Sequence, residues 1–300
     1  MFRNRVITKQ KSVEDNSRII SGTMNWGIWG NDFDSYKMES LLEKTLEIGI
    51  NTFDHADIYG GYTTETTFGT AYKNSKIERE TLRFISKCGI QFPCEERPLP
   101  VKHYNYSQAH IRMSVENSLR RLNTEYLDVL LLHRPSPLMH AETIARVLQD
   151  LQHEGKIIEL GVSNFTPSQI QLLQQELTLT WNQIECSLTH EEPLFNGTLD
   201  YMKAQSIGAM SWSPLGSYFK KNNVKIDRIS KCITPLCEKY TCSEDQLLLA
   251  WLLHHPSKIS PVVGTTSVKR LKASQEALSI NLEITDWFLM LEASMGEPLP

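Results

Sequence analysis

The sequence predicts an α/β protein whose eight parallel strands and eight helical stretches close into a (β/α)8 TIM barrel. Short β-branched or leucine-rich runs alternate strictly with longer segments of helical period, and eight such units follow one another. The 300 residues also match a barrel core of roughly 250 residues plus insertions. The alternative is an open doubly wound sheet, but "SGTMNWGIWG" lacks the Gly-x-Gly-x-x-Gly turn that such a sheet would need. With no tandem repeat or linker, residues 1–300 are expected to form a single domain.

Each expected strand is a short apolar run bounded by polar or glycine residues. In chain order the strands span Arg18–Gly22, Asn51–His55, Leu82–Lys87, Leu127–His133, Ile157–Ser163, Trp181–Ser187, Gly208–Ser213 and Ile259–Gly264. Strands that alternate with helices pair in parallel through right-handed crossovers.

Four of the segments between the strands show clear helical patterns. They cover residues 36–49, 107–123, 142–156 and 166–177, and a further helix lies around Thr285–Ala293. Gly49 and Gly155 mark helix ends, whereas Ser107 and Thr166 are N-cap residues. Pro167 in the first turn strengthens the last of these assignments.

Two long loops follow strands at the face where barrel enzymes place their active sites. Residues 89–106 follow the third strand, and loops of that length are usually lids or disordered. Residues 214–224 follow the seventh strand. Only a few residues follow the last helix, so the pocket between these loops is expected to be open on one side.

Composition and charge argue against nucleic acid and membranes as partners. The chain has 31 Lys and Arg and 35 Asp and Glu, a formal net charge of −4, with the two signs interleaved and no basic block. Residues 1–15 lack the apolar run of an export signal. No segment approaches the ~20 apolar residues of a membrane-spanning helix. The sequence therefore predicts a cytoplasmic protein and leaves its oligomeric state open.

The cysteines form no recognisable metal or redox motif. They are Cys88, Cys94, Cys186, Cys232, Cys237 and Cys242, and no two are spaced as Cys-x-x-Cys. We expect reduced thiols that pack as small hydrophobes, with a redox-sensing thiol as the alternative. No metal site is expected, because His133 has no second ligand at a recognisable spacing.

Polar side chains at three successive strand ends form the candidate catalytic set. Asp54, Lys87 and His133 end the second, third and fourth strands, and Tyr59 follows Asp54 by five residues. Each alone has an ordinary explanation as a helix cap, a rim charge, a packing histidine or a turn aromatic. Strand ends of a barrel are neighbours around one rim, so we expect the four side chains to meet in one pocket.

Together these four groups fit proton donation to an oxygen. A phenol with a pKa near 10 is a poor acid–base group at neutral pH. A nearby Lys87 ammonium would lower the Tyr59 pKa, and Asp54 would keep that lysine charged and oriented. His133 would donate a hydrogen bond to the carbonyl oxygen while hydride arrives at the carbon from another source.

At this point the chain resembles the aldo-keto reductases over nearly its whole length. The segments "FDHADIYG", "SK", "LLLHRP", "GVSNF", "WSPLG" and "VVGT" with a later arginine occur in the order typical of that family. "FDHADIYG" and "HRPSPLM" look most like its bacterial branch of general reductases. The resemblance implies a barrel that binds extended NADPH without a Rossmann fold. It also implies a tetrad in which Tyr59 is the general acid, Lys87 tunes its pKa, Asp54 holds Lys87 and His133 orients the carbonyl.

The resemblance carries further residues over to the nicotinamide cofactor. Ser163, Asn164 and Gln183 match partners of the carboxamide, and Trp212 stands where an aromatic ring, more often tyrosine, stacks on the nicotinamide. Contacts after the first strand and around the pyrophosphate are implied for Gly22, Thr23, Met24, Asp54, Ser213, Leu215 and Gly216.

For the adenosine end, Arg270 is implied as the partner of a 2′-phosphate, which a guanidinium binds as a planar fork. Many members have a Lys-Ser pair where this chain has Gly264 and Thr265, which weakens the preference for NADPH over NADH. Thr266 is a further hydroxyl donor, and Ser274 is expected to face the adenine.

The substrate is expected to be a small aldehyde or ketone, aromatic or dicarbonyl in character. Trp26 and Trp29 would line the pocket mouth beside Tyr59 and His133. Two rival functions stay open. One is a Schiff-base lyase that uses Lys87 as nucleophile. The other is a non-catalytic NADPH-binding regulatory or redox-sensing protein on the same barrel.

Overall fold

A computed structural model describes residues 17–95, 97–220 and 222–299. The expectation that residues 1–15 carry no export signal lies outside the described residues. Single-domain organisation and a cytoplasmic location stay predictions.

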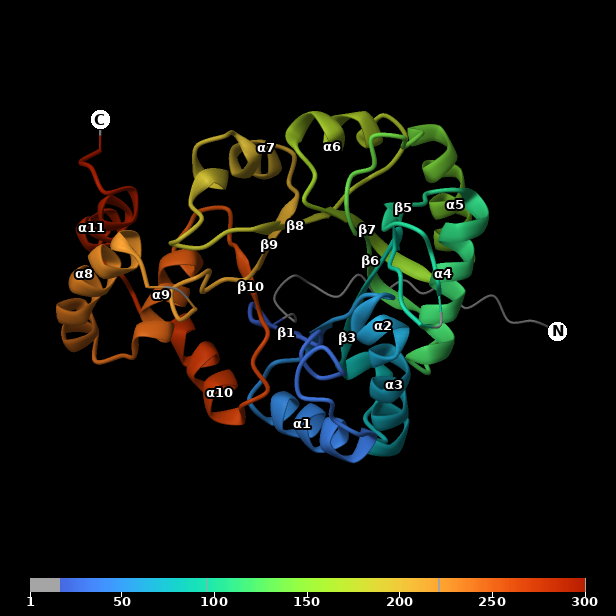
Figure 1. The fold of residues 1–300 in the computed structure, drawn as a ribbon, viewed down its shortest axis with the longest axis horizontal. Coiled ribbons are helices and arrows are strands. Elements are labelled where there is room, and N and C mark those ends of the chain that lie inside the picture. The colour runs from blue at the N-terminus through green and yellow to red at the C-terminus, as the bar shows by residue number, and fades with distance from the viewer. Residues whose placement is uncertain (1–16, 96, 221, 300) are drawn as a thin grey trace.

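Eight strands form a closed barrel, as the sequence predicts (Figure 1). They are β1 (Ile20–Gly22), β2 (Thr52–Asp54), β3 (Arg83–Cys88), β6 (Leu127–Leu132), β7 (Ile157–Ser163), β8 (Trp181–Glu185), β9 (Gly208–Trp212) and β10 (Ser260–Val263). Their order around the barrel is β1-β10-β9-β8-β7-β6-β3-β2, and every neighbouring pair is parallel. The predicted range of β7 matches residue for residue.

Helices surround the barrel on its outer side (Figure 1). They are α1 (Ser35–Glu47), α2 (Tyr59–Tyr62), α3 (Thr64–Ser75), α4 (Gln108–Arg121), α5 (Ala141–His153), α6 (Pro167–Gln174), α7 (Thr198–Ala204), α8 (Val224–Tyr240), α9 (Glu244–Leu253), α10 (Val268–Glu276) and α11 (Ile284–Met295). Short 3-10 turns lie at η2 (Arg79–Thr81), η3 (Glu192–Leu194) and η4 (Ala277–Ser279). The expected caps are present, since Ser107 accepts from the His110 N–H and Thr166 forms a capping box with Gln169.

The described residues of the loop, 89–95 and 97–106, contain an antiparallel pair that the sequence did not predict. Strand β4 (Ile90–Gln91) pairs with β5 (His103–Tyr104). Gln91 hydrogen-bonds the His110 ring at 2.8 Å and so ties this hairpin to α4. The hairpin begins at Gly89, where φ is +109° and a Cβ would lie 2.2 Å from the Tyr106 ring. The paired ends of the loop are therefore held against α4.

Two layers of core position the rim. Inside the barrel, a cluster of Ile20, Ile85, Val129, Leu131, Met210 and Val262 fills the space between the strands. A larger core lies between the strands and the surrounding helices. Packed interiors of this kind leave the strand ends as the place where polar side chains converge.

The described cysteines are all free, and burial raises the pKa of most of their thiols. The largest cause is burial for Cys186 and Cys237, whose pKa rises to about 12 in each case. Because the thiolate is the reactive form, these groups favour the interpretation of thiols as small hydrophobes.

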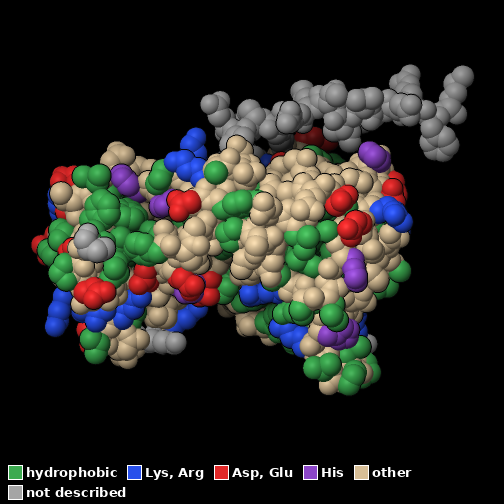
Figure 2. Space-filling model, turned by 90° about the horizontal axis from the view of Figure 1, so that it is seen from above, with side chains coloured by type: hydrophobic (Ala, Val, Ile, Leu, Met, Phe, Trp, Pro, Cys, Tyr) green, Lys and Arg blue, Asp and Glu red, His purple; other side chains and the backbone are tan. Residues whose placement is uncertain are grey.

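Two surface properties bear on partners. In the described part of the chain, the helices are all too short or too polar to traverse a lipid bilayer. Figure 2 shows hydrophobic side chains gathered at the end of the molecule where α8 and α11 lie, and Ile284, Phe288 and Leu289 of α11 are all exposed.

Candidate active site

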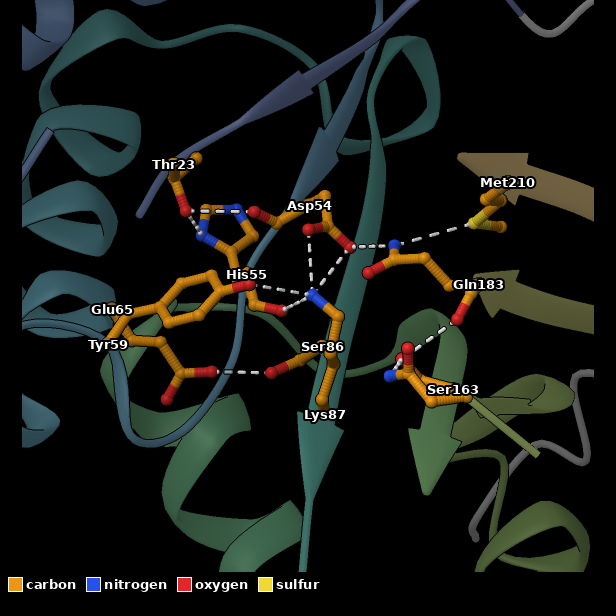
Figure 3. Close-up of polar contacts among 11 residues, drawn as sticks. Thr23, Asp54, His55, Tyr59, Glu65, Ser86, Lys87, Ser163, Gln183 and Met210 are labelled. Atoms are coloured by element: carbon orange, nitrogen blue, oxygen red, sulfur yellow. Dashed lines mark hydrogen bonds and ion pairs between the residues drawn. The ribbon is translucent and has the colours of Figure 1, made fainter. Parts of the chain in front are cut away.

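Lys87 is the centre of the polar cluster at the barrel rim (Figure 3). Its ammonium nitrogen lies 2.8 and 2.7 Å from the two carboxylate oxygens of Asp54. The same nitrogen donates to the His55 carbonyl at 2.9 Å and to the Tyr59 hydroxyl at 3.1 Å. Both members of the ion pair are buried, at 1% and 2% residue exposure for Lys87 and Asp54. The structure therefore brings three of the four predicted catalytic residues into direct contact.

Strand pairing explains why these groups meet. Strands β2 and β3 are neighbours, and Asp54 stands opposite Ile85 in their register. Successive side chains of a strand point to opposite faces, so Lys87 points into the barrel and Ser86 outward. Ser86 donates to the carboxylate of Glu65 at 2.7 Å, which fixes β3 against α3 on its outer side.

The charge state of Lys87 is set by two opposing effects. Burial lowers its pKa, but the Asp54 carboxylate and Tyr59 outweigh this effect, and the pKa is raised. An ammonium that is protonated and fully engaged in hydrogen bonds is a poor nucleophile. This geometry therefore argues against the Schiff-base lyase.

Tyr59 reaches Lys87 through a sharp turn. Gly60 and Gly61 adopt left-handed conformations with φ of 59° and 62°. A Cβ on Gly60 would also lie 2.5 Å from the Thr64 hydroxyl. The turn thus needs glycine both for its backbone conformation and for its close approach to α3.

The predicted effect of Lys87 on the Tyr59 pKa is present, but burial outweighs it. Burial is the largest cause and raises the pKa above its ordinary value of 10.0, while the Lys87 charge acts in the opposite direction. The sequence alone cannot weigh desolvation against one cation. The result is a phenol that stays protonated at neutral pH and is hydrogen-bonded to an ammonium, which is the state that a proton donor requires.

His133 completes the set beside Tyr59. The two rings approach edge to face, with centroids 6.2 Å apart. Burial lowers the His133 pKa well below its usual range, and the Lys87 charge adds to this effect. The Nδ1 atom is buried and has no hydrogen-bond partner among the described residues. His133 is therefore neutral and can donate a hydrogen bond without bringing a charge.

A chain of four hydrogen bonds crosses the barrel and ends on Asp54. Trp212 Nε1 donates to Asn164 Oδ1 at 2.8 Å, and Asn164 Nδ2 donates to Ser163 Oγ at 2.8 Å. Ser163 Oγ then donates to the Gln183 carbonyl at 3.0 Å. Gln183 Nε2 donates to Asp54 Oδ1 at 2.8 Å (Figure 3). The four residues predicted to hold the nicotinamide thus form one connected network with the ion pair.

Of the three predicted cofactor contacts at and after the end of β1, two are buried and one is exposed. Thr23 is buried, and its hydroxyl bonds the Asp54 carbonyl at 3.0 Å and the His55 ring at 2.9 Å. Gly22 is buried at the strand end opposite Asp54, whereas Met24 is exposed. Thr23 therefore supports the second strand, and Met24 is the group that presents a surface.

The loop after β9 turns tightly over the rim. Ser213 has a left-handed φ of 49°, and the Gly216 N–H donates to the Ser213 carbonyl at 2.7 Å. A Cβ on Gly216 would lie 1.9 Å from Thr189 Oγ1, so this turn needs glycine. Leu215 packs partly buried against the main core. The main chain of this loop is thereby held close to the barrel mouth.

The residues predicted to bind the adenosine end include an exposed cation and threonines that hydrogen-bond within the protein. Arg270 is exposed in the first turn of α10, next to Lys269. A helix N-terminus with two cations suits a phosphate. Gly264 is exposed, and Thr265 and Thr266 cap the neighbouring turn by accepting from Ser267 N–H and Asn31 Nδ2.

The expected contact of Ser274 with adenine stays a prediction. Ser274 is only 4% exposed, and its hydroxyl donates to the Arg270 carbonyl at 2.9 Å within the helix. A helical serine satisfies its hydroxyl in this way when its side chain faces the core.

The two tryptophans expected at the pocket mouth have different positions. Trp29 is 37% exposed and packs edge to face on Tyr59, with centroids 6.2 Å apart. Trp26 is fully buried between Phe53 and Phe68, so its expected contact with substrate is wrong. Helix α3 covers it on the outer side of the barrel.

Two rim residues were missed in the sequence. Phe92 comes from the folded loop after β3 and lies 5.1 Å from the Trp29 ring, between centroids. Arg134 directly follows His133, and its guanidinium lies 5.6 Å from the centroid of the Trp212 ring. The only sequence feature that could have indicated Arg134 was its position directly after the strand-end histidine. No sequence feature indicated Phe92.

Among the described residues, no group of three or more His, Cys, Asp or Glu side chains is arranged so that it could hold a metal ion. The cluster at the rim is instead a neutral phenol, an ion pair and a neutral imidazole beside an amide network. Trp212, Asn164 and the first turn of α10 fit an aromatic amide cofactor with a phosphate.

Comparison with known proteins decides the family. Residues 18–293 match the model described as "Aldo/keto reductase family". "Uncharacterized oxidoreductase YcsN" of Bacillus subtilis is 40% identical over 290 residues, covering 95% of this chain and 96% of that protein. The chain belongs to the aldo/keto reductase family.

Other relatives agree with this assignment. A "6-dehydroglucose reductase" of Agrobacterium fabrum is 36% identical over 292 residues, covering 94% of this aldo/keto reductase and 95% of that protein. A solved aldo/keto reductase of Klebsiella pneumoniae "in complex with NADP and acetate" is 23% identical, with a TM-score of 0.77 over 95% of this chain and 93% of that one. The likeness to that structure concerns the fold. Membership of the family makes the protein an NAD(P)H-dependent oxidoreductase of carbonyl compounds.

Proposed function

We propose that this aldo/keto reductase reduces an aldehyde or ketone to the alcohol with NADPH, and that Tyr59 donates the proton. The observation that carries the proposal is the position of the Lys87 nitrogen, within hydrogen-bond distance of both Asp54 and Tyr59. The sequence motifs "FDHADIYG" and "HRPSPLM" support membership of the bacterial branch of general reductases.

Each residue of the set has a distinct task in this reaction. The bound cofactor supplies hydride to the carbonyl carbon. The Tyr59 hydroxyl gives its proton to the carbonyl oxygen, so that the C–O double bond becomes an alcohol. Lys87 stabilises the phenolate left behind, and its partner Asp54 keeps it charged and in place. The neutral His133 ring donates a hydrogen bond to the oxygen as negative charge develops there.

We propose NADPH rather than NADH because positively charged residues lie where the adenosine end of the cofactor is expected to bind. Arg270 and Lys269 are both exposed near the start of α10, where a 2′-phosphate would meet two cations and free N–H groups. Many members of the family have a lysine at the position where this chain has Gly264, so that further positive charge is missing here. The preference is therefore tested directly by running every assay with both cofactors.

The test is steady-state oxidation of NADPH, followed by its absorbance, with a panel of aldehydes, ketones and dicarbonyls. The Agrobacterium fabrum relative is named for a sugar aldehyde, so sugar-derived aldehydes belong in the panel. Tyr59→Phe is expected to lower kcat by about 100- to 10,000-fold, the usual contribution of general acid catalysis. Its NADPH dissociation constant should stay unchanged.

Tyr36→Phe is the matched control, because Tyr36 is 77% exposed on α1. A kcat of Tyr59→Phe equal to that of the wild type would contradict the proposal that Tyr59 donates the proton. Binding of NADPH by the wild-type protein without turnover of any carbonyl would favour the non-catalytic regulator instead. Equal kcat/KM with NADH would contradict the cofactor preference.

A further inference from the structure

Arg134 is held at the rim of the active site by its own main chain. Its carbonyl accepts a hydrogen bond from the Tyr106 hydroxyl at 2.6 Å, and its N–H donates to the same hydroxyl oxygen at 3.2 Å. Tyr106 is itself only 8% exposed. The backbone that directs the Arg134 side chain is therefore fixed between β6 and the hairpin loop.

The guanidinium of Arg134 lies on the side of the site that carries Trp212. It stands 5.6 Å from the centroid of that ring, which Asn164 orients through its hydrogen bond to Trp212 Nε1. A guanidinium offers five N–H donors in a planar fork. Within the described residues, none of these side-chain donors has a hydrogen-bond partner or an ion pair. The fork is thus left for a group from outside the described part of the chain.

Arg134 directly follows His133, and its charge acts on the reacting groups. Burial is the largest cause of the raised pKa of Tyr59 and of the lowered pKa of His133, and the Arg134 charge acts on both as a smaller contribution. The exposed Lys102 also contributes to the lowered pKa of His133.

The carboxylate that acts on Tyr59 does not offset this charge. Asp54 acts on Tyr59, but its carboxylate is already paired with Lys87 at 2.7 Å. Neither Arg134 nor Lys102 forms an ion pair with a carboxylate in the described ranges.

We propose that Arg134 is an anion-binding subsite, and that the preferred carbonyl substrates carry a carboxylate. This inference rests on the proposed carbonyl reduction and names its substrate class. The carbonyl oxygen would lie between Tyr59 and His133, while the carboxylate accepts two N–H groups of the guanidinium. Trp29 beside Tyr59, and Phe92 beside Trp29, provide an apolar surface for the carbon skeleton.

The test compares para-carboxybenzaldehyde with its methyl ester, which keeps the aldehyde and removes the charge. The wild-type protein with NADPH is expected to have a kcat/KM at least about tenfold higher for the acid. Arg134→Gln should lower that value by about 10- to 100-fold for the acid and far less for the ester. Arg134→Lys should restore only part of the loss, because it lacks the planar fork. Raising the salt concentration should weaken the preference of the wild type.

Arg146→Gln is the matched control, since Arg146 is exposed on α5, and it should leave both substrates unchanged. An equal loss for acid and ester in Arg134→Gln would overturn the subsite and leave Arg134 as a structural support of Trp212. A weaker NADPH affinity with unchanged discrimination would overturn it as well, in favour of a cofactor contact.

A binding experiment separates this proposal from the proposed function. The NADPH-bound protein is titrated with para-carboxybenzyl alcohol and with its methyl ester, which requires no turnover. Tighter binding of the acid that is lost in Arg134→Gln would support the subsite even if neither aldehyde were reduced. Equal binding of both alcohols by the wild type would refute it.

Discussion

The buried carboxyl of Asp57 makes the stability of this protein depend on pH in a direction that one substitution can reveal. Asp57 lies in the loop between Asp54 and Tyr59 and is 4% exposed. Burial is the largest cause that raises its pKa from 3.8 to about 7, against the hydrogen bond from Ser114, and Glu65 raises it further. Arg97 and Arg121 lower it by smaller amounts. Its Oδ1 atom has no partner within the described residues.

The sign follows from the difference in bound protons. Between about pH 4 and pH 7 the unfolded chain has lost the Asp57 proton while the folded protein still holds it, so the free energy of unfolding falls as pH rises. The shift of about 3 pKa units corresponds to about 4 kcal/mol at about 1.4 kcal/mol per unit. Below the unfolded pKa the penalty is absent, and above the folded pKa it is complete.

Asp57→Asn removes this penalty while keeping an oxygen that accepts the Ser114 hydroxyl, now 2.6 Å from Asp57 Oδ2. The free energy of unfolding of the variant minus that of the wild type should therefore rise by about 4 kcal/mol from pH 4 to pH 8. Urea unfolding curves across that range measure it, with Asp227→Asn as control because Asp227 is exposed on α8. Parallel stability–pH curves for Asp57→Asn and the wild type would refute the reasoning.

Two further predictions concern the packing that positions the site. Trp26→Ala should lower the free energy of unfolding by about 3–5 kcal/mol through a core cavity, whereas KM for the carbonyl should stay unchanged. A large rise in KM with little loss of stability would instead place Trp26 at the substrate. Gly161→Ala should destabilise the protein by about 1–3 kcal/mol, because its Cβ would lie 2.6 Å from Leu131 Cδ2 and from the Trp181 carbonyl oxygen. Urea unfolding measures this change as well, and wild-type stability in that variant would contradict the close contact.

Much of the barrel was predictable because local and global patterns agree. Leu127–Leu132 and Ile157–Ser163 are short, mostly apolar runs typical of parallel strands, and helical stripes separate them from their neighbours. The hairpin of β4 and β5 escaped prediction because each strand has two residues, and those of β5 are exposed. Pairs that short carry no hydrophobic alternation.

The candidate site was predictable as a set of residue types in order around a rim. Asp54, Lys87 and His133 end successive strands of the barrel, so closure of the sheet brings them together. The hydrogen bond from Gln183 to Asp54 joins residues 129 positions apart, and only the interior of a closed barrel explains it. That contact lies beyond any reasoning from local spacing.

The order of strands and helices was predictable from the sequence, and the tetrad is a prediction from it, because both depend on periodicity and on side-chain types at strand ends. Only the tertiary structure decided that Trp26 is core while Trp29 borders Tyr59, although the two are three residues apart. It also decided the direction of the Tyr59 pKa and left the Arg134 fork without a partner in the described chain. Burial and the balance of charges depend on every element packed around a group, and no local stretch of sequence contains that information.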